Sequence, residues 1–506
     1  MKGKYLLTSI LGILVVNCAL AQDTLYGKVA DYYDKPIPPD AVFVDTTDSK
    51  DSASKGNEKT TKTTESVVKA SASVSQANVK WYGFVRNYFT FDTRESKAGT
   101  DELYYYVPLD ESVQADGTDI NAHPTMKWSA ITSRIGLDIK DYKINENVAI
   151  DGKIEADFYS GLTGVTGTAQ FRLRQAYTTL NWQSENKNKY SLKVGQAWHP
   201  MAADMVHSTN LEIGVPFAPF SRTPQITFNY HQGRPFSLTA SALWQMQYTS
   251  GGPEGASANY IKYSSIPEFY FGVNFKGDNG LLARVGVDLL SIKPRYKGEA
   301  SMLQNGDTVK YTALVDDRIT TVSPFVYMQY KGDKFQFRAK SILAQAGEHM
   351  NLNGGYGVTA KANGLDEDGH WEYTPVRYSS SWVSMMYGKK WQGILFAGYA
   401  KNLGTADGLL VDYTDAEGNE YANIANNYLS KNTYANINSM WRLAPGVVRN
   451  WGKLALSLEW HITSVQYGEF VKQGGVSYVS AKNGMAENNR HWITNHRLQM
   501  MLKYSF

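Results

Sequence analysis

Apolar and polar residues alternate along most of this chain. From Trp81 onward, segments of roughly ten residues repeat the alternation. A period of two places the apolar side chains of a strand on one face of a sheet and the polar ones on the other. Roughly ten residues is also the length that a tilted strand needs to cross a bilayer. The pattern predicts about 16 such strands, near residues 81–93, 131–141, 147–158, 170–182, 189–197, 224–231, 235–248, 267–276, 280–292, 320–330, 333–346, 378–388, 391–400, 433–442, 453–464 and 492–506.

The connectors between these segments alternate in length. Long ones follow the odd-numbered strands, such as residues 94–130, 198–223 and 465–491, and tight ones such as Lys331-Gly332 and Lys389-Lys390 follow even-numbered strands. Transmembrane barrels join their strands by short periplasmic turns and long extracellular loops. A soluble sandwich has no reason to alternate in this way. The sequence therefore predicts an all-β, transmembrane antiparallel β-barrel with both ends of the barrel chain on the periplasmic side.

The last predicted strand supports this interpretation. Counting back by two from Phe506 gives Tyr504 and Leu502, which are apolar or aromatic, whereas Lys503 and Ser505 fall between them. A terminal Phe with this alternation resembles the signal that the barrel assembly machinery reads. The alternative is an ordinary amphipathic strand at the end of a soluble sandwich.

The first residues have the pattern of a secretory signal peptide. Lys2 and Lys4 precede the apolar run Leu6–Val16, and Ala19-Leu20-Ala21 offers a cleavage site before Gln22. The run is shorter than the roughly 20 residues of a membrane helix. We therefore expect residues 1–21 to be a cleaved signal peptide and the mature protein to lie in the cell outer membrane, in contact with lipid and lipopolysaccharide. Lipidation at Cys18 is the less favoured alternative, because Asn17 stands where lipid-modified precursors have a small residue.

Composition agrees with a large β protein. The chain has 34 Tyr, 12 Trp and 43 Gly but only 16 Pro. Its net charge is +3, and loss of Lys2 and Lys4 would reduce it to +1. This balance argues against a nucleic-acid binder, which would carry a large clustered basic surplus. Any charge selectivity must come from local clusters of residues.

The region before the barrel has a different composition. Residues 22–79 include a Ser/Thr/Lys/Asp-rich stretch from about residue 45, with few apolar side chains for a core. We expect a periplasmic, mostly disordered tether here, followed by the barrel domain over residues 80–506.

The alternation also assigns the two faces of each strand. In segment 147–158, the even-numbered residues are apolar or small and should face lipid, so Asp151, Lys153, Glu155 and Asp157 should face the lumen. The same rule directs Ile131 and Tyr177 toward lipid. A charged interior implies a water-filled channel. The basic pore-lining candidates are Arg86, Arg134, Arg172, Arg174, Lys193, Arg284, Arg338, Lys340 and Arg497, against the acidic Asp288 and Glu459.

Arginine and lysine side chains along a pore favour anions, because their donors replace the water that a carboxylate loses. Arg172 and Arg174 are the strongest candidates for contact with a solute. The alternative is that these charges pair with wall carboxylates and only keep the wall rigid.

The connector after the fifth strand is unusually apolar. Residues 198–223 include Met201, Leu211, Phe217 and Phe220, so this loop needs a surface to pack against. It looks like the loop that folds into 16-stranded porins and narrows the channel. A buried subunit contact is the alternative. The candidates for the narrowest point are His199, Asp204, His207, Glu212 and Arg222.

Four motifs in the first half of the barrel resemble the DcaP-like family of trimeric outer-membrane porins. They are Ser133-Arg134-Ile135-Gly136-Leu137-Asp138, Phe171-Arg172-Leu173-Arg174-Gln175-Ala176-Tyr177, Val194-Gly195-Gln196-Ala197-Trp198 and Arg222-Thr223-Pro224-Gln225-Ile226. The resemblance implies a 16-stranded homotrimer that passes small anions such as dicarboxylates, with Arg134, Arg172 and Arg174 in the lumen. Members of the family can carry an N-terminal coiled coil, but residues 45–80 show no heptads here.

Other chemistry finds little support in the sequence. His199 and His207 have no third ligand at a useful spacing, so we expect neither a metal nor a cofactor. The acidic stretch Asp366-Glu367-Asp368 could hold Ca²⁺ but lacks the spacing of an EF-hand. No nucleophile-elbow motif and no P-loop motif are present, so the chain does not read as an enzyme. The sequence favours a passive diffusion channel for small hydrophilic solutes, with a structural, adhesive or host- or partner-binding barrel as the alternative.

Overall fold

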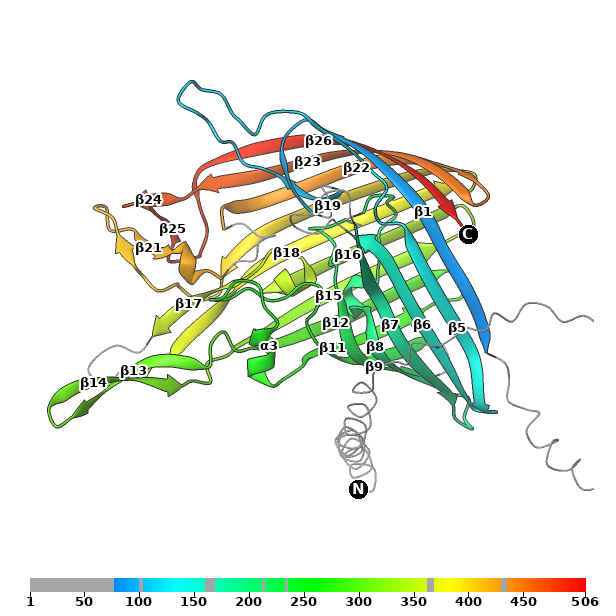
Figure 1. Cartoon of the computed structure of the whole chain (residues 1–506), viewed down its shortest axis with the longest axis horizontal. Helices are drawn as coiled ribbons and strands as arrows, with labels where there is room; N and C mark the ends of the chain where they lie inside the picture. The colour runs from blue at the N-terminus through cyan, green and yellow to red at the C-terminus, as the bar shows by residue number, and fades with distance from the viewer. Residues whose placement is uncertain are drawn as a thin grey trace, which may run out of the picture. The chain divides into compact units, whose positions relative to one another are not determined.

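The computed structural model describes residues 77–99, 103–159, 169–211, 214–232, 235–361, 368–428 and 435–506. A closed antiparallel barrel of 16 strands dominates it (Figure 1). The barrel strands are β1 (Asn78–Asp92), β5 (Arg134–Asn145), β6 (Val148–Tyr159), β7 (Gln170–Gln183), β8 (Lys189–Trp198), β9 (Arg222–His231), β10 (Phe236–Leu243), β11 (Glu268–Lys276), β12 (Leu281–Ile292), β15 (Ile319–Lys331), β16 (Phe335–Gln345), β18 (Trp371–Gly388), β19 (Trp391–Thr405), β22 (Ile437–Trp451), β23 (Leu454–Glu469) and β26 (Asn488–Ser505).

The first and last strands close the barrel. β1 pairs with β26, with Phe84 opposite Ser505. It also pairs with β5, the next barrel strand along the chain. Closure leaves the barrel sheet no free edge, which is the condition for a sheet to lie in lipid. Among the described residues, no helix is long and apolar enough to cross a membrane.

The predicted fold class is confirmed, and a strand occupies each predicted segment. The largest boundary errors concern β18, which begins at Trp371 instead of residue 378, and β22, which continues to Trp451 instead of residue 442. β22 continues through Pro445, where its ladder with β23 is interrupted between Leu443 and Gly446. Proline lacks an N–H donor and the local sequence resembles a turn, so the alternation alone ended the strand too early.

The N-terminal predictions fall almost entirely outside the described residues. This holds for the signal peptide at 1–21 and for residues 22–76 of the predicted tether. β1 begins at Asn78, two residues before the predicted start of the barrel domain at residue 80.

Long and short connections alternate, as the sequence predicts. The short turns include residues 332–334 and 389–390, and they lie at the end of the barrel where β26 terminates (Figure 1). The long connections at the other end carry further elements: β2 (Ser96–Gly99), β3 (Tyr104–Pro108), β4 (Thr125–Ser129), η1 (Pro200–Ala202), α3 (Asn259–Ser264), β13 (Lys297–Gln304), β14 (Asp307–Leu314), η2 (Gly347–Met350), β17 (Tyr356–Lys361), β20 (Tyr413–Thr414), β21 (Glu420–Asn423), η3 (Ile424–Asn426), β24 (Val471–Gln473) and β25 (Val476–Ser480).

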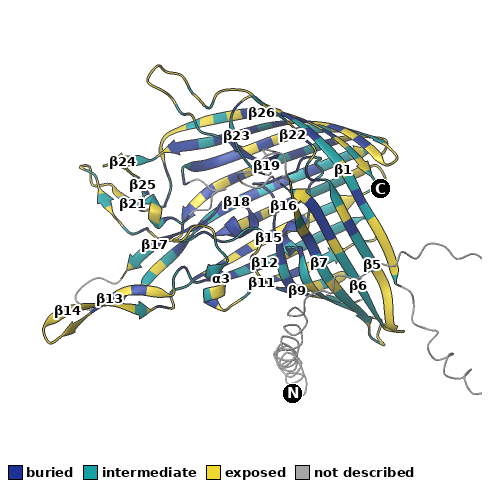
Figure 2. Cartoon of the chain, viewed as in Figure 1, coloured by how far each residue is buried: buried dark blue, intermediate teal, exposed yellow. Residues whose placement is uncertain are grey.

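The two faces of the barrel wall differ as the alternation predicts. Buried and exposed residues alternate along strands such as β19 and β23 (Figure 2). The apolar members of the outer set, such as Ile154, Phe171 and Leu173, are strongly exposed because their neighbour would be lipid. Their inward neighbours Glu155 and Asp157 are buried.

A β-bulge changes the predicted faces in β7. Glu155 lies opposite Gln175, but the next residue, Ala156, lies opposite Leu173, so Arg174 is an extra residue in β7. Arg174 and Gln175 both turn inward, and the alternation is reversed beyond them. Tyr177 therefore does not face lipid as predicted. Its ring lies 4.8 Å from the Lys193 ammonium inside the barrel.

Ile131 is also misassigned by the alternation. It precedes β5, which begins only at Arg134, and it packs against the buried hydrophobic cluster inside the barrel. A residue outside the strand is not bound by the period-two rule.

Three of the long connections fold into the lumen. Residues 199–221 after β8 contribute Met201, Val215 and Phe217, which are fully buried. Every residue of β3 is buried, and so is every residue of η2. The inward-folded constriction loop is thus confirmed, but no pattern in the sequence indicated that two further connections would join it.

Candidate functional site

The constriction loop, residues 199–221, is held by polar wall residues. Arg442 donates to the carbonyl oxygen of Val215 at 2.9 Å and to that of Tyr106, in β3, at 2.7 Å. On the next strand, Glu459 accepts from the Thr209 backbone N–H at 2.9 Å and from the Ser208 hydroxyl at 3.1 Å. These bonds satisfy loop backbone groups inside the barrel, where leaving them unpaired would be costly.

Strands β12 and β16 bind the loop through Asp204. Its carboxylate accepts from Arg284 at 2.8 Å and from Lys340 at 3.0 Å. Lys340 also donates to the Met201 carbonyl oxygen at 2.5 Å, and Arg338 donates to the Met205 carbonyl oxygen. Three of the predicted pore-lining residues therefore anchor the loop directly.

An apolar contact completes the anchoring. Phe217 packs over Gly398 of β19, where a Cβ atom would lie only 2.6 Å from the ring. The Ser380 hydroxyl donates to the Phe217 carbonyl oxygen at 2.6 Å, and the ring of Phe396 lies 6.1 Å away. Only glycine at position 398 lets the ring approach the wall so closely.

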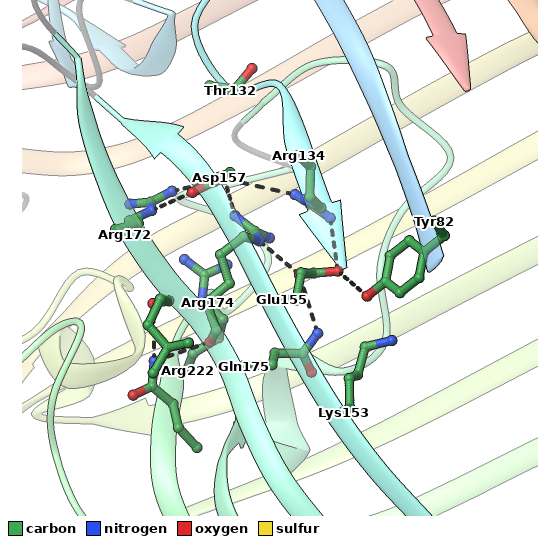
Figure 3. A network of polar contacts seen from close by, with 12 residues as sticks. Tyr82, Thr132, Arg134, Lys153, Glu155, Asp157, Arg172, Arg174, Gln175 and Arg222 are labelled. Atoms are coloured by element: carbon green, nitrogen blue, oxygen red, sulfur yellow. Dashed lines mark hydrogen bonds and ion pairs between the residues drawn. The ribbon is translucent and has the colours of Figure 1, made fainter. Parts of the chain in front are cut away.

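The remaining wall carries a cluster of arginines around two carboxylates (Figure 3). Asp157 of β6 accepts from Arg172 at 2.8 Å and from Arg174 at 2.6 Å. Glu155 accepts from Arg174 at 2.8 Å and lies 3.5 Å from a guanidinium nitrogen of Arg134. Arg174 points inward as the alternation predicts, and the bulge in β7 turns Gln175 inward beside it, where its amide donates to Glu155 at 3.3 Å.

Two more arginines of this cluster have neutral partners. Arg86 donates to the hydroxyl and the carbonyl oxygen of Thr132, at 3.1 and 3.3 Å. Arg222 lies over the rings of Trp198 and Phe220, 4.8 and 5.5 Å from their centroids, and its Nη1 has no hydrogen-bond partner among the described residues. Five arginines thus surround two carboxylates, which leaves the cluster positively charged.

The cluster faces the constriction loop across a narrow gap. A cavity of about 40 Å³ lies between Arg86, Arg134, Arg172 and Arg174 on the wall and Leu211 on the loop. A wider cavity of about 970 Å³ lies beside it, lined by Lys193, Arg284 and neutral polar side chains of β8 to β12. The space between the arginines and the loop is therefore much smaller than the second cavity.

The other predicted site residues have different positions. Arg497 is buried in a bidentate pair with Asp92, at 2.9 and 2.8 Å. His207 contacts Gln336 at 3.2 Å. His199 is fully buried, 2.5 Å from Glu268. Glu212 lies outside the described residues.

Sequence reasoning missed two parts of the site. Arg442 ends a predicted strand between the lipid-facing Trp441 and Leu443, so the alternation could have identified it. The role of β3 has no comparable signal, because three of its five residues are tyrosines, which suit either a surface or a core.

The closed barrel, its inward-folded loop and its charged lumen define the class of this protein: an outer-membrane β-barrel channel of the porin type. Residues 47–198 match the family model of the DcaP outer membrane protein, so the predicted resemblance is confirmed over that part of the chain. These likenesses are those of a channel rather than of an enzyme.

Several solved structures of outer-membrane proteins are similar to this chain. The outer membrane channel DcaP of Acinetobacter baumannii is similar at 17% identity, over 85% of this chain and 97% of that chain, with a TM-score of 0.53. OmpT of Vibrio cholerae matches at 12% identity, over 85% and 98%, with a TM-score of 0.44. An anion-selective porin from Comamonas acidovorans matches at 10% identity, over 85% and 100%, with a TM-score of 0.44. No curated protein sequence matches this chain.

Proposed function

We propose that this barrel is a passive diffusion channel that favours small anions, with dicarboxylates as the substrate class. The observation that carries the proposal is the surplus of arginines over carboxylates beside the small cavity between the wall and the constriction loop. Each guanidinium offers a planar set of donors that suits a carboxylate. Lys193 and Arg284 in the wider cavity would receive the second carboxylate of a solute leaving the arginines.

The ion pairs within the cluster refine which arginines matter most. Arg172 and Arg174 already share the charges of Asp157 and Glu155, so part of their charge is balanced. Arg134 lies farther from both carboxylates, and Arg222 has aromatic neighbours instead. We assign the net positive field to the cluster as a whole and expect Arg134 and Arg222 to contribute most to it.

The test is the reversal potential of single channels in planar bilayers under a salt gradient. Replacing Arg134 or Arg222 with Gln removes one positive charge. In water, such a charge at about 4 Å from an anion lowers the anion's free energy by about 1 kcal/mol, which corresponds to a roughly fivefold higher occupancy. We expect each variant to shift selectivity toward cations and to slow dicarboxylate flux. Arg449→Gln is the matched control, because Arg449 lies between Trp391 and Trp451 beside a short turn.

An unchanged reversal potential in both variants would contradict the anion preference. A channel that stays closed in every condition would instead favour the structural or adhesive alternative. The resemblance to DcaP-like porins also supports a homotrimer, which chemical cross-linking and three-step channel closures would reveal.

A further inference from the structure

A group of ionisable side chains that the proposed function does not use lies at the root of the constriction loop. It consists of His199 at the start of that loop, Glu268 at the first position of β11, Asp288 of β12 and His349 of η2. All four residues are at most 2% exposed. Ligand atoms of His199, Glu268 and Asp288 lie within 4.8 Å of one another.

The hydrogen bonds of the two histidines fix their protons. The Met201 backbone N–H donates to Nδ1 of His199 at 3.1 Å, so a neutral His199 carries its proton on Nε2, which lies 2.5 Å from Oε1 of Glu268. Nδ1 of His349 lies 3.1 Å from the Ala346 carbonyl oxygen, which can only accept. His349 therefore holds a proton on Nδ1, and its Nε2 is directed at the carboxylates, 3.3 Å from Glu268 and 3.7 Å from Asp288.

Several buried atoms at the centre of the group have no hydrogen-bond partner among the described residues. They are Nε2 of His349, Oε2 of Glu268 and both carboxylate oxygens of Asp288. Unpaired buried polar atoms are costly, and two neighbouring buried carboxylates need a positive charge beside them, from a protonated histidine or from a metal ion. Nε2 of His349 faces Oε1 of Glu268 and Oδ2 of Asp288, and an imidazole nitrogen with carboxylate oxygens is a donor set that suits a divalent metal ion.

We propose that His349, Glu268 and Asp288 bind a divalent first-row transition metal such as Zn²⁺, and that His199 positions Glu268 by donating to it. Ligand atoms around tetrahedral zinc are about 3.3 Å apart, close to the separations between His349 and the two carboxylates. The charges of the two carboxylates balance the ion. A nitrogen ligand favours a transition metal over Ca²⁺ or Mg²⁺. A histidine proton held on a backbone carbonyl is the usual support for a metal-bound imidazole.

The metal would tie separate parts of the barrel together. Glu268 and Asp288 belong to the wall, whereas His349 and His199 belong to two connections that fold into the lumen. Bound metal would therefore fix the root of the constriction loop and η2 against β11 and β12. Zinc in this position is structural, because every ligand is buried.

The test is the metal content of the full-length barrel, refolded with Zn²⁺, Mn²⁺ or Ca²⁺ and then dialysed. We expect about one Zn²⁺ per chain, little Ca²⁺, and an X-ray absorption spectrum with one imidazole nitrogen among oxygen ligands. Asp288→Asn and His349→Ala should abolish retention. His199→Ala should retain Zn²⁺ with affinity reduced about 10- to 100-fold, because it acts through Glu268. His461→Gln, at a buried histidine beside the single carboxylate of Glu459, should bind as the unsubstituted protein does.

A second measurement covers variants that fold poorly. Chelation of the unsubstituted protein should lower the temperature at which the barrel unfolds in detergent, and added Zn²⁺ should restore it. If the refolded unsubstituted protein retains no more metal than the dialysis buffer contains, the proposal is overturned. Protons on the histidines and carboxylates would then balance the charge of this group. Full retention of Zn²⁺ in Asp288→Asn and His349→Ala would overturn it as well.

Discussion

At the scale of single residues, Asp157 is the point on which the arginine cluster depends. Its carboxylate is fully buried and accepts hydrogen bonds from Arg172 and Arg174, and a guanidinium nitrogen of Arg134 lies 4.0 Å away. Several guanidinium groups can lie so close together only because this carboxylate and Glu155 reduce their mutual repulsion. In the proposed function the cluster supplies positive charge to the pore, whereas its own stability depends on the two carboxylates that reduce that charge.

Replacing Asp157 with Asn should separate the two roles. The arginines would lose a buried counter-charge, which we expect to destabilise the barrel by about 3 kcal/mol, while the local field becomes more positive. Unfolding temperature in detergent and reversal potential would measure the two effects. Asp151→Asn is the matched control on the same strand, because Asp151 contacts Asn181 and a backbone N–H rather than arginine. An unfolding temperature equal to that of the control would show that the arginines do not need Asp157.

A second residue-scale prediction concerns pH and an exposed pair in the long connections. The Asp317 carboxylate accepts from His370 at 2.5 Å, and this hydrogen bond raises the pKa of His370 above its usual 6.5. Because the folded pKa is the higher one, the pair stabilises the loop fully below pH 6.5 and less as pH rises through the raised pKa. The N–H of Trp371, which also donates to Asp317, should lose protection from hydrogen exchange over that interval. In His370→Gln the protection of the Trp371 N–H should no longer change with pH. A pH-dependent loss of protection in this variant would show that the His370–Asp317 pair is not its cause.

At the scale of elements, the constriction loop behaves as part of the core rather than as a surface loop. It packs on the wall through Phe217, bonds to the wall through Arg442 and Asp204, and contacts β3 through Phe220, whose ring lies 5.4 Å from that of Tyr104. Charged and apolar contacts with several wall strands therefore hold the loop. The width of the passage depends on these anchors more than on the loop's own conformation.

Gly398→Val should test that dependence. A valine side chain would clash with Phe217, so we expect the loop to move away from β19, conductance to change, and stability to fall by about 1–3 kcal/mol. Gly393→Val is the control, because a Cβ atom at this position of the same strand meets nothing within 4 Å. Single-channel conductance measures the outcome. Equal conductance in the two variants would show that Phe217 does not set the passage width.

At the scale of the whole molecule, the barrel is a complete closed unit from Asn78 onward. Every strand of the wall has two hydrogen-bonded neighbours, and three inward connections fill much of the lumen with their own core. We therefore propose that residues 22–76 act as a tether that contributes little to folding.

Deleting residues 45–76 should leave the barrel assembled and its conductance unchanged, because a Ser/Thr/Lys-rich stretch buries too little apolar surface to stabilise the fold. Heat-modifiable mobility on gels reports assembly, and planar-bilayer recording reports conductance. Failure of the shortened chain to insert would show that the stretch is a folded or assembly element.

The sequence by itself determined the barrel, the number of its strands, the ends at which turns and loops lie, and most of the lipid-facing residues. All of these follow from local periodicity, because lipid and water impose a period of two on every strand. The tertiary structure alone decided the bulge that turns Gln175 and Tyr177 inward, the insertion of β3 and η2, and the meeting of His199 with Glu268, Asp288 and His349. These features depend on contacts between residues far apart in the chain, and no local pattern encodes which distant strand a loop will reach.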